Sequence, residues 1–133
     1  MDHEFIAEWF RFADTDLLSA EHLQSLYPQP LEIICYHCQQ SVEKSLKGYL
    51  INKGAMEPPK THNLNTLIDM CLEYDEHFDK IKRICDTLNR YGVQPRYPNE
   101  IEILEQDMLK ALEYARQIWN FEALMEVRQK TSL

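Results

Sequence analysis

Apolar residues recur at three- and four-residue intervals in every long segment of the chain, and no segment alternates between apolar and polar positions as a half-buried strand would. This spacing predicts helices over about residues 4–26, 30–54, 62–75, 78–91 and 100–127. The six prolines, together with Gly54 and Gly92, lie between these segments or at their ends, where they interrupt regular helix. We therefore expect an all-α fold, an up-and-down bundle of about five helices.

One apolar face on each predicted helix defines the expected core. These faces consist of Phe5, Trp9, Phe12, Ala13, Leu17 and Ala20; of Leu31, Ile34, Cys35, Cys38, Val42, Leu46 and Tyr49; of Leu64, Leu67, Ile68, Cys71 and Leu72; of Ile81, Ile84, Cys85 and Leu88; and of Ile101, Leu104, Met108, Ala111, Leu112, Ala115, Ile118 and Trp119. At the helix ends, Pro30 suits a first helical position, Gly54 suits the position after a C-cap, and Thr61 is a candidate N-cap.

Two cysteines, Cys35 and Cys38, have the C-x-x-C spacing of redox and metal sites. A thioredoxin-like site would lie beside a βαβ pattern, which the sequence lacks, and a zinc site would need two further ligands. The remaining cysteines, Cys71 and Cys85, also fall on apolar faces. We therefore favour four buried thiols over a redox or metal centre, and we predict no metal and no cofactor.

Composition narrows the class of protein further. The chain has 133 residues, of which 44% are hydrophobic and 27% are charged, as expected for one globular domain spanning residues 1–133. Its net charge of −8 argues against a broad phosphate-binding surface, so any contact with nucleic acid should be local. No apolar run is long enough to span a bilayer, and Met1 is followed by acidic residues and a histidine instead of a basic signal region. We expect a cytoplasmic protein with reduced thiols.

The second predicted helix also has a polar face that could carry function. Tyr36, Gln40, Glu43 and Lys47 share one strip, which His37 and Lys44 flank; together these groups could bind an anion or a nucleotide. The alternative is a solvated face on which Glu43 and Lys47 form an i,i+4 ion pair worth about 0.2–0.5 kcal/mol. Composition alone favours the solvated face.

An acidic residue, Asp16, interrupts the apolar face of the first predicted helix. An unpaired carboxylate is costly to bury, so Asp16 either reaches water or pairs with a side chain near the polar strip. Lys44, Lys47 and Tyr97 are the candidate partners.

Four short motifs resemble those of the HEPN domain family, in the family's order and over nearly the whole chain. They are Trp9-x3-Ala13-x2-Asp16-Leu17-x2-Ala20, the stretch YHCQQSVEKSLKGYL at residues 36–50, His62-Asn63-Leu64 and Arg96-Tyr97-Pro98. The resemblance implies a HEPN-like bundle of about five helices, usually dimeric, with the two longest helices roughly antiparallel. It also implies nucleotide binding, or partnership with a minimal nucleotidyltransferase in a toxin–antitoxin-like system.

Other HEPN proteins are metal-independent ribonucleases, in which an arginine is followed after four to six residues by a histidine at the dimer cleft. This chain departs from that pattern, because every arginine except Arg11 lies after the last histidine, His77, and the next histidine after Arg11 is His22. We therefore assign no catalytic residue and favour a binding subunit over the alternative, a divergent ribonuclease acting at a dimer cleft.

The candidate ligand-binding residues are Tyr36, His37, Gln40, Lys44, Lys47, His62, Arg96 and Tyr97. Because Tyr97 precedes a proline, it favours an extended backbone, which could direct Arg96 toward the polar strip for bidentate phosphate binding. Arg96 could equally tie down its own loop by bonding Glu43 or backbone carbonyls. A homodimer is expected from the resemblance and from the many aromatic residues, including Trp9, Phe10, Phe12, Trp119 and Phe121.

Overall fold

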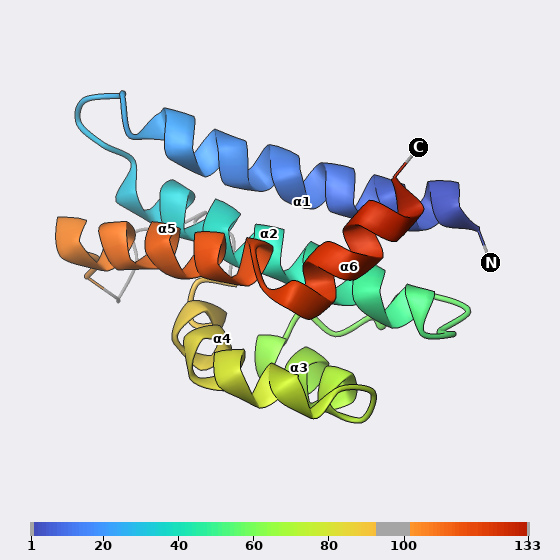
Figure 1. Ribbon diagram of the computed structural model, residues 1–133. Coiled ribbons are helices and arrows are strands. Elements are labelled where there is room, and N and C mark those ends of the chain that lie inside the picture. The colour runs from blue at the N-terminus through green and yellow to red at the C-terminus, as the bar shows by residue number, and fades with distance from the viewer. Residues whose placement is uncertain (1, 93–101, 133) are drawn as a thin grey trace.

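The chain folds into helices that pack side by side, in a computed structural model that describes residues 2–92 and 102–132 (Figure 1). The helices are α1 (His3–Leu23), α2 (Leu31–Asn52), α3 (Leu64–Leu72), the 3-10 helix η1 (Glu76–Ile81), α4 (Lys82–Asn89), α5 (Glu105–Trp119) and α6 (Glu122–Thr131). The described residues contain no strand, which confirms the all-α prediction. They form six α-helices where the sequence predicted about five helices in all.

The two longest helices, α1 and α2, run antiparallel and pack along most of their length (Figure 1). Helix α5 lies against α2, and the short elements α3, η1 and α4 form a layer below them. Helix α6 turns toward α1 and brings the C-terminal end of the chain near the N-terminal end. Since α2 contacts α1, α3, α4, α5 and α6, its side chains face neighbours on almost every side.

The last predicted helix is in fact two helices, which corrects the prediction for residues 100–127. Helix α5 ends at Trp119, and Phe121 has the extended backbone angles φ −65° and ψ 131°. The side-chain amide of Asn120 donates to the carbonyl of Arg116 at 3.0 Å, a local bond of the kind that competes with continued helix. The change of direction brings the ring of Phe121 against Phe78, with centroids 5.0 Å apart.

The ends of the other helices differ from the sequence prediction in smaller ways. Asn63, not Thr61, caps α3, because its side chain accepts from the backbone amides of Asn65 and Thr66. Pro30 takes the N-cap position of α2, so the helix begins at Leu31, one residue later than predicted. Gly54 follows the C-cap of α2 with a φ of 114°, as predicted from its freedom to adopt left-handed angles. The predicted helix over residues 78–91 divides into η1 and α4.

Helix α1 buries the predicted face only in part: Ala13, Leu17 and Ala20 are in the core as predicted, but Phe5 and Phe12 are not. The core receives Ile6, Phe10, Ala13, Leu17 and Ala20, whereas Phe5 and Phe12 remain 42% and 49% exposed. Apolar residues cover a wide arc of α1, so helical spacing fits two neighbouring stripes equally well. Packing against α2 favours the stripe that contains Phe10, because the Phe10 ring fits into the space that Gly48 leaves on α2.

The four cysteines are buried, which confirms the prediction that the C-x-x-C pair lies in the core. Burial raises the pKa of Cys35 and of Cys85 to about 12, and it raises the pKa values of Cys38 and Cys71 still further. These thiols are therefore protonated hydrophobic groups at neutral pH. Across residues 2–92 and 102–132, no helix is long and apolar enough to cross a membrane.

Gly48 allows the close approach of α1 and α2, which generates the first prediction. A Cβ atom at this position would lie 2.9 Å from Cε2 of Phe10, whose ring is buried. Gly48→Ala should lower the free energy of unfolding by about 1–2 kcal/mol, although alanine has the higher helix propensity by about 1 kcal/mol. Urea unfolding would measure the change. In a Phe10→Leu background the same substitution should be neutral or stabilising, and an equal loss in both backgrounds would show that the ring contact is not the cause.

Candidate functional site

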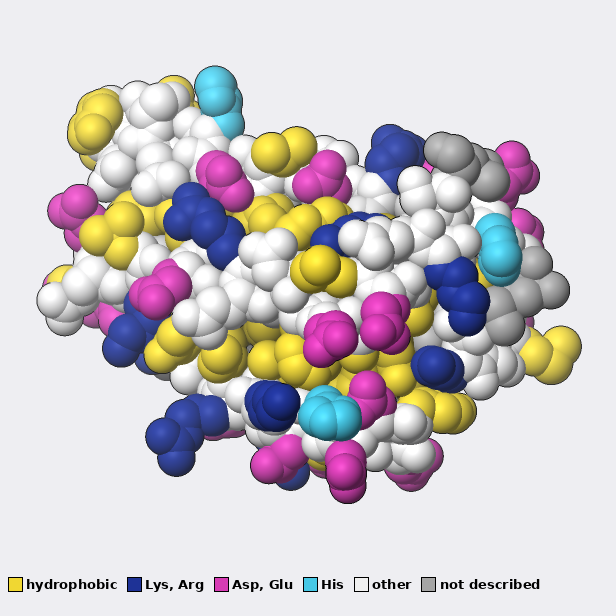
Figure 2. All heavy atoms as spheres, in the orientation of Figure 1, with side chains coloured by type: hydrophobic (Ala, Val, Ile, Leu, Met, Phe, Trp, Pro, Cys, Tyr) yellow, Lys and Arg dark blue, Asp and Glu magenta, His cyan; other side chains and the backbone are white. Residues whose placement is uncertain are grey.

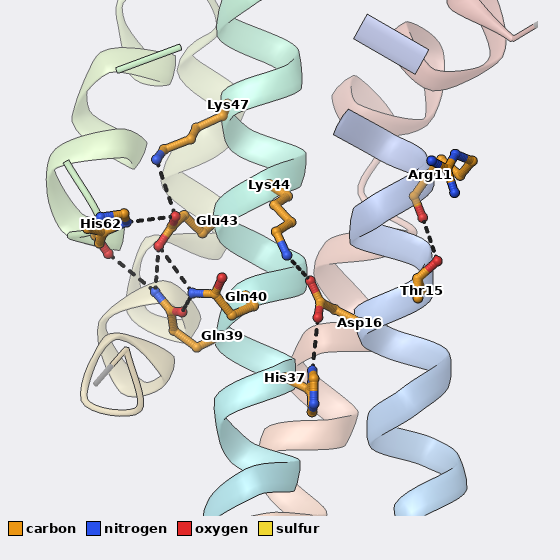
Figure 3. A network of polar contacts seen from close by, with 10 residues as sticks. All are labelled: Arg11, Thr15, Asp16, His37, Gln39, Gln40, Glu43, Lys44, Lys47 and His62. Atoms are coloured by element: carbon orange, nitrogen blue, oxygen red, sulfur yellow. Dashed lines mark hydrogen bonds and ion pairs between the residues drawn. The ribbon is translucent and has the colours of Figure 1, made fainter. Parts of the chain in front are cut away.

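Most of the polar side chains that the sequence analysis selected lie around two buried carboxylates, those of Asp16 and Glu43 (Figure 3). Asp16 on α1 contacts His37 and Lys44 on α2, and we name these three residues the Asp16 cluster. Glu43 on α2 contacts Gln39, Gln40, Lys47 and His62, and we name these five residues the Glu43 cluster. The two clusters lie on opposite sides of α2 in Figure 3, one toward α1 and the other toward the segment that leads into α3.

In the Asp16 cluster, both carboxylate oxygens are used. Oδ1 lies 2.9 Å from Nδ1 of His37, and Oδ2 accepts from Nζ of Lys44 at 2.5 Å. The antiparallel packing of α1 and α2 brings these residues together, although they are 21 and 28 positions apart in sequence. The Asp16 side chain is only 12% exposed, so the predicted need for a partner is confirmed, and Lys44 was among the predicted candidates. His37 is a second partner that the sequence analysis did not assign to Asp16.

In the Glu43 cluster, one carboxylate is bonded on both oxygens. Oε2 accepts from Nζ of Lys47 at 3.2 Å and lies 3.0 Å from Nδ1 of His62, while Oε1 accepts from the Gln39 amide at 3.3 Å. The Gln39 amide also donates to the backbone carbonyl of His62 at 3.2 Å, which ties α2 to the start of α3. Glu43 and Lys47 side chains are each 5% exposed. The predicted i,i+4 ion pair of Glu43 and Lys47 is therefore present, but the interpretation as a solvated face is wrong for these two residues, because their ion pair lies inside the bundle.

The structure brings together most of the predicted ligand-binding residues but gives them different access to the surface. His37 and Lys44 side chains are 28% and 25% exposed, and that of His62 is 74% exposed. Lys47 is buried, with its ammonium group 6.0 Å from the ring centroid of Trp9. Two further residues remain near the surface: Tyr36 packs edge-on against the His37 ring, and Gln40 donates to Oε1 of Gln39 at 2.8 Å. Arg96 and Tyr97 lie outside the described residues.

Sequence reasoning missed Gln39, which is fully buried and bonds both to Glu43 and to the backbone of residue 62. A signal was available, since Gln39 and Glu43 are four residues apart and therefore neighbours on one helix. This spacing did not identify Gln39 as buried, because nothing in the helical pattern shows that the segment before α3 covers this part of α2.

The geometry of the two histidines determines what the clusters can do chemically. Each ring contacts its carboxylate through Nδ1, an arrangement that fixes the ring orientation and leaves Nε2 for another group. His37 lines a groove of about 480 Å³ together with Thr15, Ser19 and His22 of α1. A second groove, of about 410 Å³, is lined by Phe5, Glu8, Trp9 and Phe12 of α1 and by Lys44. The polar groups among these residues can donate or accept hydrogen bonds.

The fold and the sequence together define the class of protein. Residues 6–126 match the HEPN domain family, so the chain belongs to that family. Its fold is similar to that in the crystal structure of TT1696 from Thermus thermophilus, with a TM-score of 0.71 over 96% of this chain and 99% of that chain. The two sequences are 20% identical, so this similarity concerns the fold alone. No curated protein matches the sequence.

The burial of Glu43 generates the second prediction. Glu43→Gln should lower the free energy of unfolding by about 3 kcal/mol, because the Lys47 ammonium group would remain buried without its counter-ion. The double variant Glu43→Gln/Lys47→Met should recover part of this loss, since it removes both charges. Urea unfolding monitored by circular dichroism would measure both.

A matched control is the exposed ion pair between Lys82 and Asp69, with an Nζ–Oδ1 distance of 3.4 Å and side chains 51% and 62% exposed. Asp69→Asn should change the free energy of unfolding by no more than about 0.5 kcal/mol. If Glu43→Gln were as mild as this control, the buried pair would not have the structural role assigned to it.

Proposed function

We propose that this HEPN protein is a cytoplasmic nucleotide- or partner-binding subunit that acts as a homodimer with a minimal nucleotidyltransferase in a toxin–antitoxin-like system. The observation that carries the proposal is the pair of carboxylate clusters, because each holds a histidine in a defined orientation at the edge of α2. A side chain that is already ordered loses less conformational entropy when a ligand binds. His37 and His62 are therefore suited to recognition.

The available groups favour a small anionic ligand or a short stretch of RNA. Lys44 has three N–H donors, of which Asp16 takes one, and the Tyr36 hydroxyl and Gln40 amide add polar contacts near it. Arg96 would add a planar fork for a phosphate group. Figure 2 shows Lys and Arg side chains interspersed with Asp and Glu on the face drawn, without one large basic area. This distribution fits a local contact, as the net charge of −8 also suggests.

A ribonuclease remains the second candidate, and the Asp16–His37 contact favours it. A carboxylate that contacts Nδ1 leaves Nε2 of His37 able to accept a proton from a ribose 2′-hydroxyl. The 2′-oxygen would attack phosphorus and the bond from phosphorus to the 5′-oxygen would break, giving a 2′,3′-cyclic phosphate and a 5′-hydroxyl whose oxygen takes a proton from water. This reaction would differ from the family mechanism, because no arginine precedes a histidine at the family's spacing.

Binding of AMP and ATP by isothermal titration calorimetry would test the main proposal. Lys44→Met and His62→Ala should each weaken binding about tenfold, the loss expected for one hydrogen bond to a charged group. His77→Ala is the matched control, because His77 also contacts a carboxylate through Nδ1, that of Asp75, but lies on η1 outside both clusters. Circular dichroism would confirm that each variant is folded.

These measurements distinguish the two candidate functions, nucleotide binding and RNA cleavage. If the wild-type protein binds neither nucleotide, or if His77→Ala weakens binding as much as His62→Ala, the proposed nucleotide site is wrong. Incubation with a short RNA tests the second candidate in parallel. Cyclic phosphate ends that form with wild type but not with His37→Ala would establish the ribonuclease, and their absence with wild type would exclude it.

A further inference from the structure

Three aromatic side chains lie along a side of α1 that the core does not fully cover: Phe5 and Phe12 are exposed, and Trp9 is partly buried against the core. Phe5, Trp9 and Phe12, which we name the α1 stripe, are spaced i, i+4 and i+7, so they follow one line along the helix. Phe5 and Phe12 are 42% and 49% exposed, and the Phe5 ring meets Trp9 edge-on with centroids 6.4 Å apart. The groove of about 410 Å³ described above runs over these rings.

Of the α1 stripe, Trp9 packs against the core of its own subunit, whereas Phe5 and Phe12 are exposed. Ile6 and Phe10 already fill the interface of α1 with the bundle, and both are almost fully buried. An exposed aromatic patch with charged residues at its edge is typical of a protein–protein interface. Because the rings follow helical spacing, the surface that fits them is another helix.

The charges beside the α1 stripe identify that helix. Glu8 and Arg11 flank the rings with side chains 51% and 61% exposed, and within one subunit they pair with each other at 2.6 Å. The Arg11 guanidinium also lies 4.6 Å from the Phe12 ring centroid. Suppose that two copies of α1 pack antiparallel, with Phe5 of each copy opposite Phe12 of the other. The two-fold axis of the pair then crosses each helix between Glu8 and Trp9. Glu8 then lies about 3 Å along the axis from Arg11 of the other copy, at a rise of about 1.5 Å per residue. The surface is therefore complementary to itself in both shape and charge.

We propose that the α1 stripe is the interface of a two-fold symmetric homodimer in which the two α1 helices pack antiparallel. Such an interface requires one patch to match itself, and the order Phe5, Glu8, Arg11, Phe12 meets this requirement. The inference rests on the homodimer that forms part of the proposed function and specifies which surface builds it. Lys44 lines the same groove, so the Asp16 cluster of each subunit lies at the edge of the interface.

Charge reversal tests the antiparallel arrangement directly. Glu8→Arg gives each copy two positive charges at the interface, and Arg11→Glu gives each copy two negative charges. Each variant alone should have a dimer dissociation constant at least tenfold above that of wild type, because like charges would face each other. An equimolar mixture of the two variants should form a heterodimer at least as tight as the wild-type dimer. Sedimentation equilibrium, with one variant carrying a mass tag, would measure all four species.

The control is the pair Asp69→Lys and Lys82→Glu on α3 and α4, which should leave the dimer constant unchanged. If wild type is dimeric and the α1 variants dimerise equally well, the interface assignment is wrong while the homodimer stands. If wild type is monomeric at tens of micromolar, both the assignment and the homodimer part of the proposed function are wrong. Circular dichroism of each variant separates loss of the interface from loss of the fold.

Cross-linking provides a second measurement that does not depend on charge. Phe5→Cys mixed with Phe12→Cys should form a disulfide-linked heterodimer faster than either variant alone, since residues 5 and 12 of different copies face each other in the proposed arrangement. The four native cysteines are buried and should not compete. Equal rates in the mixture and in the separate variants would overturn the antiparallel pairing.

Discussion

The burial of two carboxylates is the constraint on which the arrangement of this bundle depends. A buried carboxylate is costly unless its oxygens are bonded, so Asp16 and Glu43 each require donors from neighbouring elements. Asp16 obtains them from α2, which fixes how α1 and α2 are aligned along each other. Glu43 contacts the His62 ring, and the Gln39 amide donates to the backbone carbonyl of His62. These two contacts fix the start of α3 against α2. A shift of α1 would take the Asp16 carboxylate away from Lys44, and a shift of the start of α3 would remove the His62 contact of the Glu43 carboxylate.

Buried ion pairs of this kind need not raise the stability of a fold, since a well-packed apolar replacement is often equally stable. In this protein the buried carboxylates also determine where certain surface side chains lie. The same carboxylates that align the helices also hold the imidazoles of His37 and His62. The same residues therefore support the fold and form the candidate site. A variant must be shown to be folded before its loss of binding is assigned to a lost ligand contact.

Sequence reasoning succeeded where local spacing determines the outcome. The core face of α2, from Ile34 through Cys35, Cys38 and Val42 to Leu46, followed from one uninterrupted stripe. It failed where tertiary contact decides between local alternatives. Helix α1 has two apolar stripes, and tertiary contacts such as that of Phe10 with Gly48 select the buried one. The polar strip of α2 looked solvated, because the cover over Glu43 comes from residue 62, nineteen positions away.

Nuclear magnetic resonance of the histidine side chains tests the central claim most directly. Long-range ¹H–¹⁵N spectra at about pH 9, where a free imidazole is neutral, report which ring nitrogen carries the proton. If Asp16 and Glu43 hold the two imidazoles, Nδ1 of both His37 and His62 should carry a proton, and it should lose that proton in Asp16→Ala and Glu43→Ala respectively, which remove the acceptor. His3, which is exposed, serves as the internal reference. An unprotonated Nδ1 on either ring in the wild-type protein would contradict the account.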